Sequence, residues 1–409
     1  MRTRWLLPIL LSALPACGGL SNDAGIRALA GQDLLLGSSD GVLSLDAGTG
    51  AVTFQGQGVP ALGSWSSLYT TVVSRSSTML EAHDSLSGEL VSRLEVPGEM
   101  SVRVASPNGG LVALMPPLGR DASPWIPEPR ATTSLVIADP SGELEPRTYE
   151  LRGNFEPEAF SSDGSGLYMV SYVPATAPEA YRVARLDLDS GKVREVSTGI
   201  KGVVETMSGT RLEQVAEPDG SMLHTLYTTS PASYVEHAHQ QAGTTVSFVH
   251  MLSLDRHWAH CLALPKPMWG GDPADQTMAL SPDGELLYVV DSAQGLITEV
   301  DTNSPETLRT NEAYLGFGGQ APTQATVSPD GTLFVSTGTR IVGIDTATLQ
   351  RSGGWTMDDV VLGLGSDGRR IFVALPGRIE VLDRSSNGPL GTIASPAVDE
   401  VSYIGLSGD

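Results

Sequence analysis

Residues 279–290 read Ala-Leu-Ser-Pro-Asp-Gly-Glu-Leu-Leu-Tyr-Val-Val, and residues 326–335 repeat this pattern as Thr-Val-Ser-Pro-Asp-Gly-Thr-Leu-Phe-Val. Each copy predicts a short strand, a tight turn and a second strand rich in large apolar residues. Asp followed by Gly suits such a turn because both residue types tolerate a positive φ. Weaker copies of the turn begin at Ser106, Ser161, Glu217 and Gly365. The chain is therefore built from a repeat.

A second turn gives an independent count of the copies. In each copy an aspartate closes the third strand, and in most copies a glycine follows within five residues; these aspartates are Asp46, Asp84, Asp139, Asp187, Asp255, Asp301, Asp345 and Asp383. They lie roughly 38 to 68 residues apart, a period typical of the four-stranded blades of a β-propeller. We expect eight blades, with seven as the alternative, because the copy from Leu62 to Leu94 lacks a clear first turn.

The two ends of the repeat region complement each other. The first copy begins at its second strand, with Leu34, Leu35 and Leu36, and the chain ends on Tyr403–Asp409, which reads as an innermost strand cut off in its first turn. Joining them would complete one blade from both termini and close the ring without open edges. The expected fold is all-β, a single propeller domain over residues 32–409.

The N-terminus predicts export. Arg2 and Arg4 precede an apolar stretch that is too short to span a bilayer, which is typical of a secretory signal at residues 1–16. The sequence Leu14-Pro15-Ala16-Cys17 resembles a bacterial lipobox, so Cys17 is the expected lipid attachment site and residues 17–31 the tether. The mature chain is then extracytoplasmic and anchored to a bacterial membrane. The alternative is an ordinary signal peptide and a secreted or periplasmic protein.

The charge of the chain limits its partners. The sequence contains 47 acidic and 25 basic residues, a formal net charge of −22. Nucleic acid and anionic lipid both require a basic surface, so neither is an expected partner, and membrane contact is expected only through the anchor.

The Ser-Pro-Asp-Gly turn followed by Leu-Tyr-Val-Val, together with the Asp-to-Gly turn, resembles the YVTN/WD40-like superfamily of bacterial propellers. The resemblance covers nearly all of the mature chain, although the Gly-His and Trp-Asp pair of true WD40 repeats is missing. Some proteins of this architecture are lactonases or quinoprotein dehydrogenases and many are binding scaffolds. The repeat motif is structural, so the resemblance transfers no catalytic residue to this sequence.

Long inserts interrupt the repeat on one side only. In a propeller, the loops between second and third strands and the connections between blades open on the same face, which we call the insert face. The inserts are Pro116–Thr132, Pro174–Glu179, Thr229–Thr245, Pro265–Asp272 and Asn311–Pro322. Long loops in an economical repeat usually carry function. The aromatic residues in or beside them are the candidate binding residues: Trp125, Tyr172, Tyr181, Tyr234, Trp269, Tyr314 and Phe317. The alternative is that these aromatics only pack the inserts against the blades.

Six of the seven histidines lie between His224 and His260, within the fifth copy. His237 and His239 would lie on one side of an extended segment, and with Glu236 or Asp272 they could bind a divalent metal such as zinc. A second set would form within the blade if His224 and His250 were cross-strand neighbours beside Cys261. Packed, hydrogen-bonded imidazoles are the alternative for both sets. A divalent metal is the only cofactor that the sequence suggests.

Signatures of common enzymes are missing: the sequence contains no Gly-x-Ser-x-Gly elbow, phosphate loop, Cys-x-x-Cys pair or haem attachment motif. We therefore expect a binding scaffold that recognises an envelope protein or another surface component through the insert face of blades 3 to 6. The alternative is an enzyme of the lactonase or dehydrogenase type, with a metal or a small substrate near the mouth of the channel.

Overall fold

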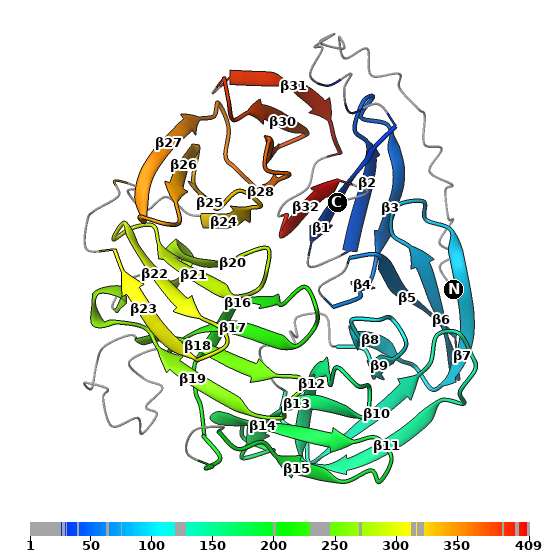
Figure 1. Ribbon diagram of the computed structural model, residues 1–409. Coiled ribbons are helices and arrows are strands. Elements are labelled where there is room, and N and C mark those ends of the chain that lie inside the picture. Colours follow the sequence, from blue (N-terminus) through cyan, green and yellow to red (C-terminus); the bar gives the residue numbers. More distant parts are fainter. Residues whose placement is uncertain are drawn as a thin grey trace, which may run out of the picture.

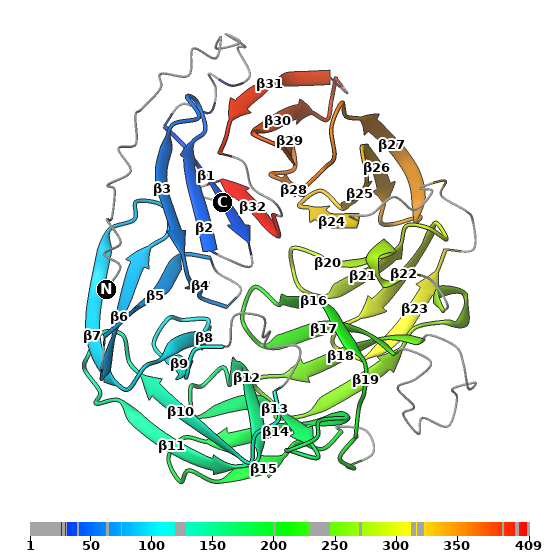
Figure 2. The ribbon, with the colours of Figure 1, turned by 180° about the vertical axis from the view of Figure 1, so that it is seen from behind.

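The computed structural model describes residues 26, 29, 31–38, 41–62, 65–74, 76–118, 128–198, 202–229, 246–269, 272–311, 316, 323–386, 388–396 and 401–406. They form a ring of eight blades (Figures 1 and 2), and each blade is a four-stranded antiparallel sheet. This arrangement confirms the prediction of an eight-bladed β-propeller.

The strands of each blade follow one another from the innermost to the outermost. In that order, blade 1 contains β32 (Tyr403–Leu406), β1 (Asp33–Ser38), β2 (Gly41–Asp46) and β3 (Val52–Gln57). Blade 2 contains β4 (Val59–Pro60), β5 (Ser67–Val73), β6 (Ser77–Asp84) and β7 (Leu90–Pro97). Blade 3 contains β8 (Ser101–Ala105), β9 (Val112–Met115), β10 (Thr132–Ala138) and β11 (Arg147–Arg152). Blade 4 contains β12 (Asn154–Phe160), β13 (Gly166–Val173), β14 (Ala180–Asp187) and β15 (Val193–Glu195).

The second half of the ring has the same order. Blade 5 contains β16 (Thr210–Ala216), β17 (Met222–Thr229), β18 (Val246–Ser253) and β19 (Ala259–Ala263). Blade 6 contains β20 (Gln276–Leu280), β21 (Leu286–Asp291), β22 (Leu296–Asp301) and β23 (Glu306–Thr310). Blade 7 contains β24 (Thr323–Ser328), β25 (Thr332–Thr337), β26 (Arg340–Asp345) and β27 (Gln350–Thr356). Blade 8 contains β28 (Gly363–Ser366), β29 (Arg370–Leu375), β30 (Arg378–Asp383) and β31 (Gly388–Ala394).

Helical structure in the described ranges is confined to short turns. Two 3₁₀ helices, η1 (Lys266–Met268) and η2 (Pro273–Asp275), connect blade 5 to blade 6. Within the described part of the chain, we find no helix with the length and apolar character that crossing a bilayer requires.

The ring closes as the sequence predicts. The C-terminal strand β32 pairs antiparallel with β1, with Leu36 opposite Ile404 and Leu34 opposite Leu406. In Figure 1 the red β32 accordingly lies beside the blue β1. One blade is thus built from both ends of the chain, which removes the open edge that a linear array of sheets would leave.

The core lies between blades rather than at the centre of the ring. Among the described residues, buried apolar side chains form eight clusters, one for each pair of neighbouring blades. Because side chains alternate across a strand, each sheet supplies one face to the preceding cluster and the other face to the next. The residues that fill one interface can therefore differ from those that fill the other interfaces.

The repeated turn residues act as expected for turn chemistry. In blade 6, Ser281 Oγ donates a hydrogen bond of 2.5 Å to Asp283 Oδ1 and accepts one of 2.9 Å from the Leu286 amide. Gly284 has a φ of +78°, which only glycine adopts without strain. In blade 2 the innermost strand β4 contains only two residues, and the sequence that follows it has no Ser-Pro-Asp-Gly pattern.

Candidate functional site

The innermost strands of blades 3, 4 and 5 differ from the others by their charged residues. Strand β8 carries Arg103, β12 carries Glu156 and Glu158, and β16 carries Arg211 and Glu213. The described innermost strands of the other five blades contain no charged residue. Charge on the inner strands is thus concentrated in one arc of the ring.

The same three strands are also the irregular ones. The pairing register shifts between Val102 and Val104, between Pro157 and Ala159, and between Arg211 and Glu213. The described pairing of the other innermost strands runs without a shift. A β-bulge redirects a side chain and is common beside functional sites. In all three strands the bulge lies at or next to a charged residue.

Glu156 joins blade 3 to blade 4. Its Oε1 lies 2.9 Å from Arg103 Nε, and its Oε2 lies 2.9 Å from Arg130 Nη2. Arg130 also donates a hydrogen bond of 2.6 Å to the Phe155 carbonyl. Burial lowers the pKa of the Arg103 guanidinium, although Glu156 opposes this shift. The arrangement balances one buried carboxylate with two guanidinium groups.

Glu158 and Arg211 form the corresponding contact between blades 4 and 5. Arg211 Nη1 lies 3.7 Å from Glu158 Oε1, and the two side chains are 8% and 2% exposed. Burial raises the pKa of Glu158 and lowers that of Arg211. Gln214 Nε2 donates to Glu158 Oε1 at 3.4 Å and to Thr225 Oγ1 at 3.0 Å. This pair forms the inner end of the interface between blades 4 and 5.

A pocket of about 170 Å³ opens next to this pair, between blades 4 and 5. Its lining comes from β13, the β13–β14 loop, β14, the connection between the blades, β16 and β17: Val170, Tyr172, Pro178, Glu179, Ala180, Tyr181, Ser208, Gly209, Arg211 and Tyr227. A loop between second and third strands and a blade-to-blade connection both border it. The pocket therefore lies on the insert face.

Three tyrosines determine the character of the pocket. The rings of Tyr181 and Tyr227 stack with their centroids 5.3 Å apart, and the Tyr172 ring meets that of Tyr181 edge-on at 6.4 Å. Phe248 continues the stack behind Tyr227 at 5.3 Å. Burial raises the pKa of all three tyrosines, so their hydroxyl groups stay protonated and can donate hydrogen bonds.

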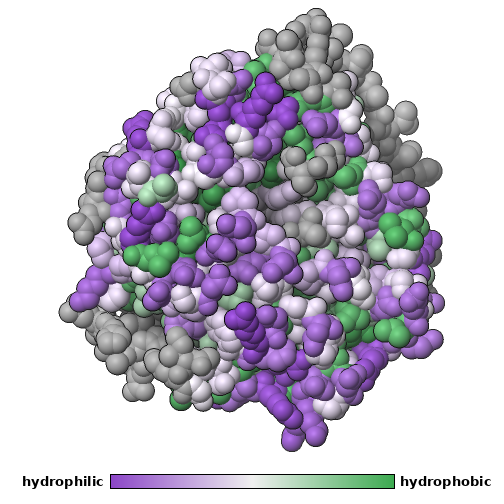
Figure 3. All heavy atoms as spheres, viewed as in Figure 1, coloured by the Kyte–Doolittle hydropathy of each residue, from purple (hydrophilic) through white to green (hydrophobic). Residues whose placement is uncertain are grey.

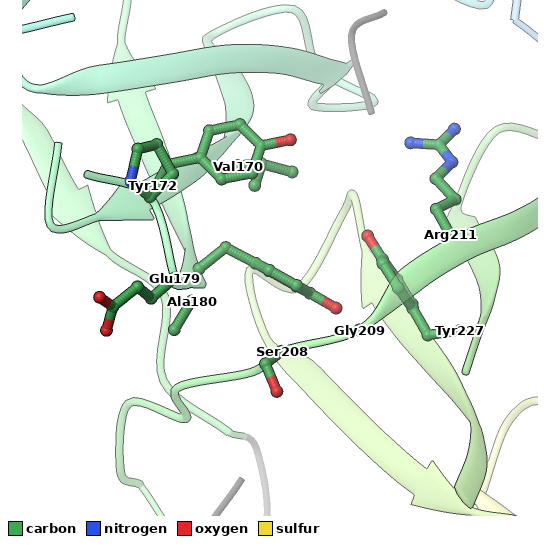
Figure 4. A pocket seen from close by; sticks show the side chains of 10 residues that line it. Val170, Tyr172, Glu179, Ala180, Ser208, Gly209, Arg211 and Tyr227 are labelled. Carbon is green, nitrogen blue, oxygen red and sulfur yellow. The ribbon is translucent and has the colours of Figure 1, made fainter. Parts of the chain in front are cut away.

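The close view shows how the polar groups are directed. In Figure 4, Tyr172 and Tyr227 direct their hydroxyl ends into the space between the blades, and the guanidinium of Arg211 lies at the side of that space. The carboxylate of Glu179 and the hydroxyl of Ser208 point away from it. On the face seen in Figure 3, the described residues are mainly hydrophilic around a central hollow, with hydrophobic side chains in small separate groups.

The expected binding aromatics have different positions. Tyr172 and Tyr181 belong to the core between blades 4 and 5, are 9% and 6% exposed, and line the pocket, so their part in binding stays a prediction. Trp269 is half-buried and donates a hydrogen bond of 2.7 Å from Nε1 to the Leu264 carbonyl. The other four candidates lie outside the described residues: Trp125, Tyr234, Tyr314 and Phe317.

The first expected metal set is described at one position only. Asp272 caps η2, where its side chain accepts a hydrogen bond of 3.0 Å from the Ala274 amide. Glu236, His237 and His239 lie outside the described residues, as does the expected lipid site Cys17.

The second expected set is separated by the strand register. His224 lies opposite Met251, whereas His250 lies opposite Thr225 and Cys261. A register that differs by one residue places side chains on opposite faces of a sheet. His224 therefore faces away from His250, and its Nε2 lies 3.2 Å from Glu217 Oε1. The described residues contain no group of three His, Cys, Asp or Glu side chains that could hold a metal.

Five residues of this region were not predicted from the sequence: Arg103, Glu156, Glu158, Arg211 and Tyr227. The signal for the first four was their position, because each is a charged residue in a segment that aligns with an uncharged innermost strand elsewhere in the repeat. Tyr227 lies within β17, which resembles the second strand of any other blade, so no local pattern distinguished it.

No protein-family model and no curated protein matches the sequence. Among solved structures, apo AztD from Citrobacter koseri aligns over 92% of this chain and 97% of its own, with 15% identity and a TM-score of 0.55. The dihydro-heme d1 dehydrogenase NirN in complex with DHE aligns over 97% of this chain and 78% of its own, with 12% identity and a TM-score of 0.53. The periplasmic gluconolactonase PpgL of Pseudomonas aeruginosa aligns over 92% and 98%, with 17% identity and a TM-score of 0.42. At such identities the likeness concerns the fold alone, and by its fold the chain is an eight-bladed β-propeller.

Proposed function

We propose that this chain is an extracytoplasmic, lipid-anchored binding protein, and that the insert face over blades 3 to 6 binds a protein of the cell envelope. The pocket between blades 4 and 5 receives one side chain of that partner. The proposed extracytoplasmic location and lipid anchor rest on the N-terminal sequence, with Cys17 as the lipidated residue. Incorporation of a fatty-acid label, and its loss in C17S, tests this part separately.

The observation that carries the proposal is the size of the pocket. Its volume of about 170 Å³ is well below the roughly 300–1,000 Å³ of sites that enclose a small-molecule ligand or cofactor. A cavity of about 150 Å³ holds benzene, which is the ring of one aromatic side chain. The pocket therefore suits a single anchoring side chain better than a whole substrate.

The walls of the pocket suit such an anchor. Stacked rings offer rigid apolar area, and the hydroxyl ends that Tyr172 and Tyr227 direct into the pocket make part of its wall polar, which suits an anchor with a polar tip. Anchors in buried, well-packed pockets contribute most of the energy in many protein interfaces. The pairing of the strands in blades 4 and 5 holds these walls in place. Binding therefore costs little conformational entropy in the pocket.

Photo-crosslinking in living cells tests the proposal within a single blade. A photoreactive residue replaces Glu179, which is exposed at the rim of the pocket. The matched control replaces Asp189, whose side chain is 98% exposed in a turn on the opposite face of blade 4. We expect a discrete high-mass adduct from position 179 and none from position 189.

A filling substitution then tests the pocket itself. A180F places a ring in the pocket without removing a tyrosine or Arg211, and we expect it to reduce the adduct from position 179 by about tenfold or more, as loss of an anchor does. Equal adducts from both faces, or a full yield in the A180F variant, would contradict the proposal.

A catalytic role is the second candidate, and one observation favours it. Glu158 has a raised pKa because of burial and pairs with Arg211 at the wall of the pocket. A buried carboxyl of this kind can serve as a general acid, and one solved structure with this fold is a dehydrogenase. Native mass spectrometry of the purified protein separates the two candidates, because an enzyme site would retain a small molecule that E158Q loses.

A further inference from the structure

A second, smaller void lies in the same interface between blades 4 and 5, outside the pocket. Its volume is about 10 Å³, and its lining includes Thr198, Glu205, Met207, His250 and Cys261. A space of roughly 10–15 Å³ is about the room that one water molecule needs. The void is therefore the size of a single small guest, such as one ion.

Two sulfur atoms meet at this void. Cys261 Sγ lies 3.1 Å from Met207 Sδ, although the two residues are 54 positions apart in the chain. Met207 is held in place by its backbone, because its amide and carbonyl exchange hydrogen bonds of 2.8 Å with those of Tyr181 on β14. The same connection is fixed to β19 through the bridge between Thr198 and Ala259. Met207 is thus held against β14, and Cys261 is part of β19, so β-sheet pairing fixes both sulfur-bearing residues.

An imidazole completes the arrangement. His250 on β18 lies directly opposite Cys261 on β19, and cross-strand partners point their side chains to the same face of a sheet. His250 is 1% exposed, and within the described structure its Nε2 is buried without a hydrogen-bond partner. A buried ring nitrogen left in this state costs free energy unless a ligand occupies it. Its position beside the void indicates where that ligand would be.

We propose that Cys261, Met207 and His250 form a binding site for one Cu(I) ion. Thiolate and thioether sulfur are soft ligands that select Cu(I), and imidazole also suits copper. Binding replaces the proton of the Cys261 thiol, which passes to solvent, while the thioether and the neutral imidazole each donate a lone pair. Copper keeps its oxidation state throughout. Structural zinc sites take four ligands, almost always from Cys, His, Asp and Glu. Glu205, His250, His260 and Cys261 all border the void, but among the described residues no three His, Cys, Asp or Glu side chains are placed to hold a metal together, so this set does not suit zinc.

The site is independent of the pocket and of any partner, so its test needs only the purified chain. The full chain carries C17S, which removes the only other cysteine. Cu(I) is titrated without oxygen against a coloured Cu(I) chelator, and X-ray absorption identifies the atoms bonded to the metal. We expect one Cu(I) per chain, bonded to two sulfur atoms and one nitrogen.

Variants assign the ligands. M207L preserves the shape of the side chain and leaves Cys261 and His250 in place, and we expect it to lower the affinity about tenfold or more and to leave one sulfur in the spectrum. C261S should abolish binding, and H250Q should remove the nitrogen. M251L is the matched control, because Met251 is equally buried but faces blade 6 from the opposite side of β18. Urea unfolding of each variant shows that it is folded.

Three results would overturn the proposal: no Cu(I) bound in competition with the chelator, unchanged binding in both M207L and C261S, or Zn(II) retained in preference to Cu(I). M207L keeps the Cys261 thiol and a side chain of similar shape at position 207. It therefore remains informative even if C261S fails to fold.

Discussion

Ile404 on the closing strand offers a quantitative test of how the ring is held together. Strand β32 has only four residues and pairs with β1 alone, so the closure depends on a few side chains. Ile404 is 6% exposed and packs into the cluster between blades 8 and 1, with Leu36 and Val401. We consider the substitution I404A.

The expected loss follows from the atoms removed. Ile→Ala removes three carbon atoms, which at about 0.8 kcal/mol for each buried carbon represents about 2.4 kcal/mol of lost transfer free energy. The cavity left behind adds to this loss, giving about 3 kcal/mol, within the usual range of about 2–5 kcal/mol. For a chain of this length the melting temperature should fall by roughly 3–4 °C.

Urea unfolding followed by far-UV circular dichroism measures the loss. L308A is the control, because Leu308 is 47% exposed on the outer strand β23 and should cost less than about 1 kcal/mol. If the ring unfolds as one unit, I404A shifts a single transition for the whole chain. Equal losses in I404A and L308A, or a loss confined to a minor separate transition, would refute the view that β32 holds the ring closed.

Three further predictions concern polar contacts. The double substitution E158L with R211M replaces the charge pair between blades 4 and 5. Because burial disfavours both charges, the free energy of unfolding should stay unchanged or rise by about 1–4 kcal/mol. A fall of more than about 2 kcal/mol, measured by urea unfolding, would contradict this. Glu213 Oε2 accepts hydrogen bonds from the Met278 amide at 2.8 Å and from Thr277 Oγ1 at 2.9 Å, so E213A should cost about 1–3 kcal/mol and speed hydrogen exchange at that amide. Hydrogen bonds from Ser161 and the Ser165 amide lower the pKa of Asp163 from 3.8 to about 2. Its ionised form therefore stabilises the fold above pH 3.8, and this contribution, about 1 kcal/mol after solvent screening, is lost as the pH falls through about 2. Between pH 5 and pH 2, D163N should lose correspondingly less stability than the parent in urea titrations.

The architecture could be predicted from the sequence because its determinants are local. The turn around Asp283 and Gly284 is specified by residues within one short segment, and an aspartate lies at the end of the third strand of every blade or within two residues after it. Repetition of such a signal gives the number of blades without any knowledge of packing. The closing strand was recognisable for a related reason, since the first copy lacked one strand and the last residues supplied it.

The site could not be predicted in the same way, because it depends on register and on contacts between blades. The expected pairing of His224 with His250 was wrong by one residue, and one residue is enough to move a side chain to the other face. The insert between the two strands does not fix the register, since its length permits several pairings. Met207 has no signal in the sequence, because it lies in a connection and reaches Cys261 only when blades 4 and 5 are packed together.

The composition of the interface between blades 4 and 5 is difficult to explain by stability. The interface between blades 6 and 7 is filled by leucine, isoleucine, valine and alanine with one tyrosine, whereas that between blades 4 and 5 combines four tyrosines with a buried charge pair and a buried histidine. Apolar replacements of a buried ion pair are often neutral or stabilising, so such groups are weak contributors to folding. Bulges in two consecutive innermost strands, β12 and β16, add further irregularity at this interface. A buried carboxylate also joins blades 3 and 4, so the polar groups that cost stability are concentrated in one arc of the ring. Such groups are expected where the ring binds something, and the pocket and the sulfur pair both lie in that arc.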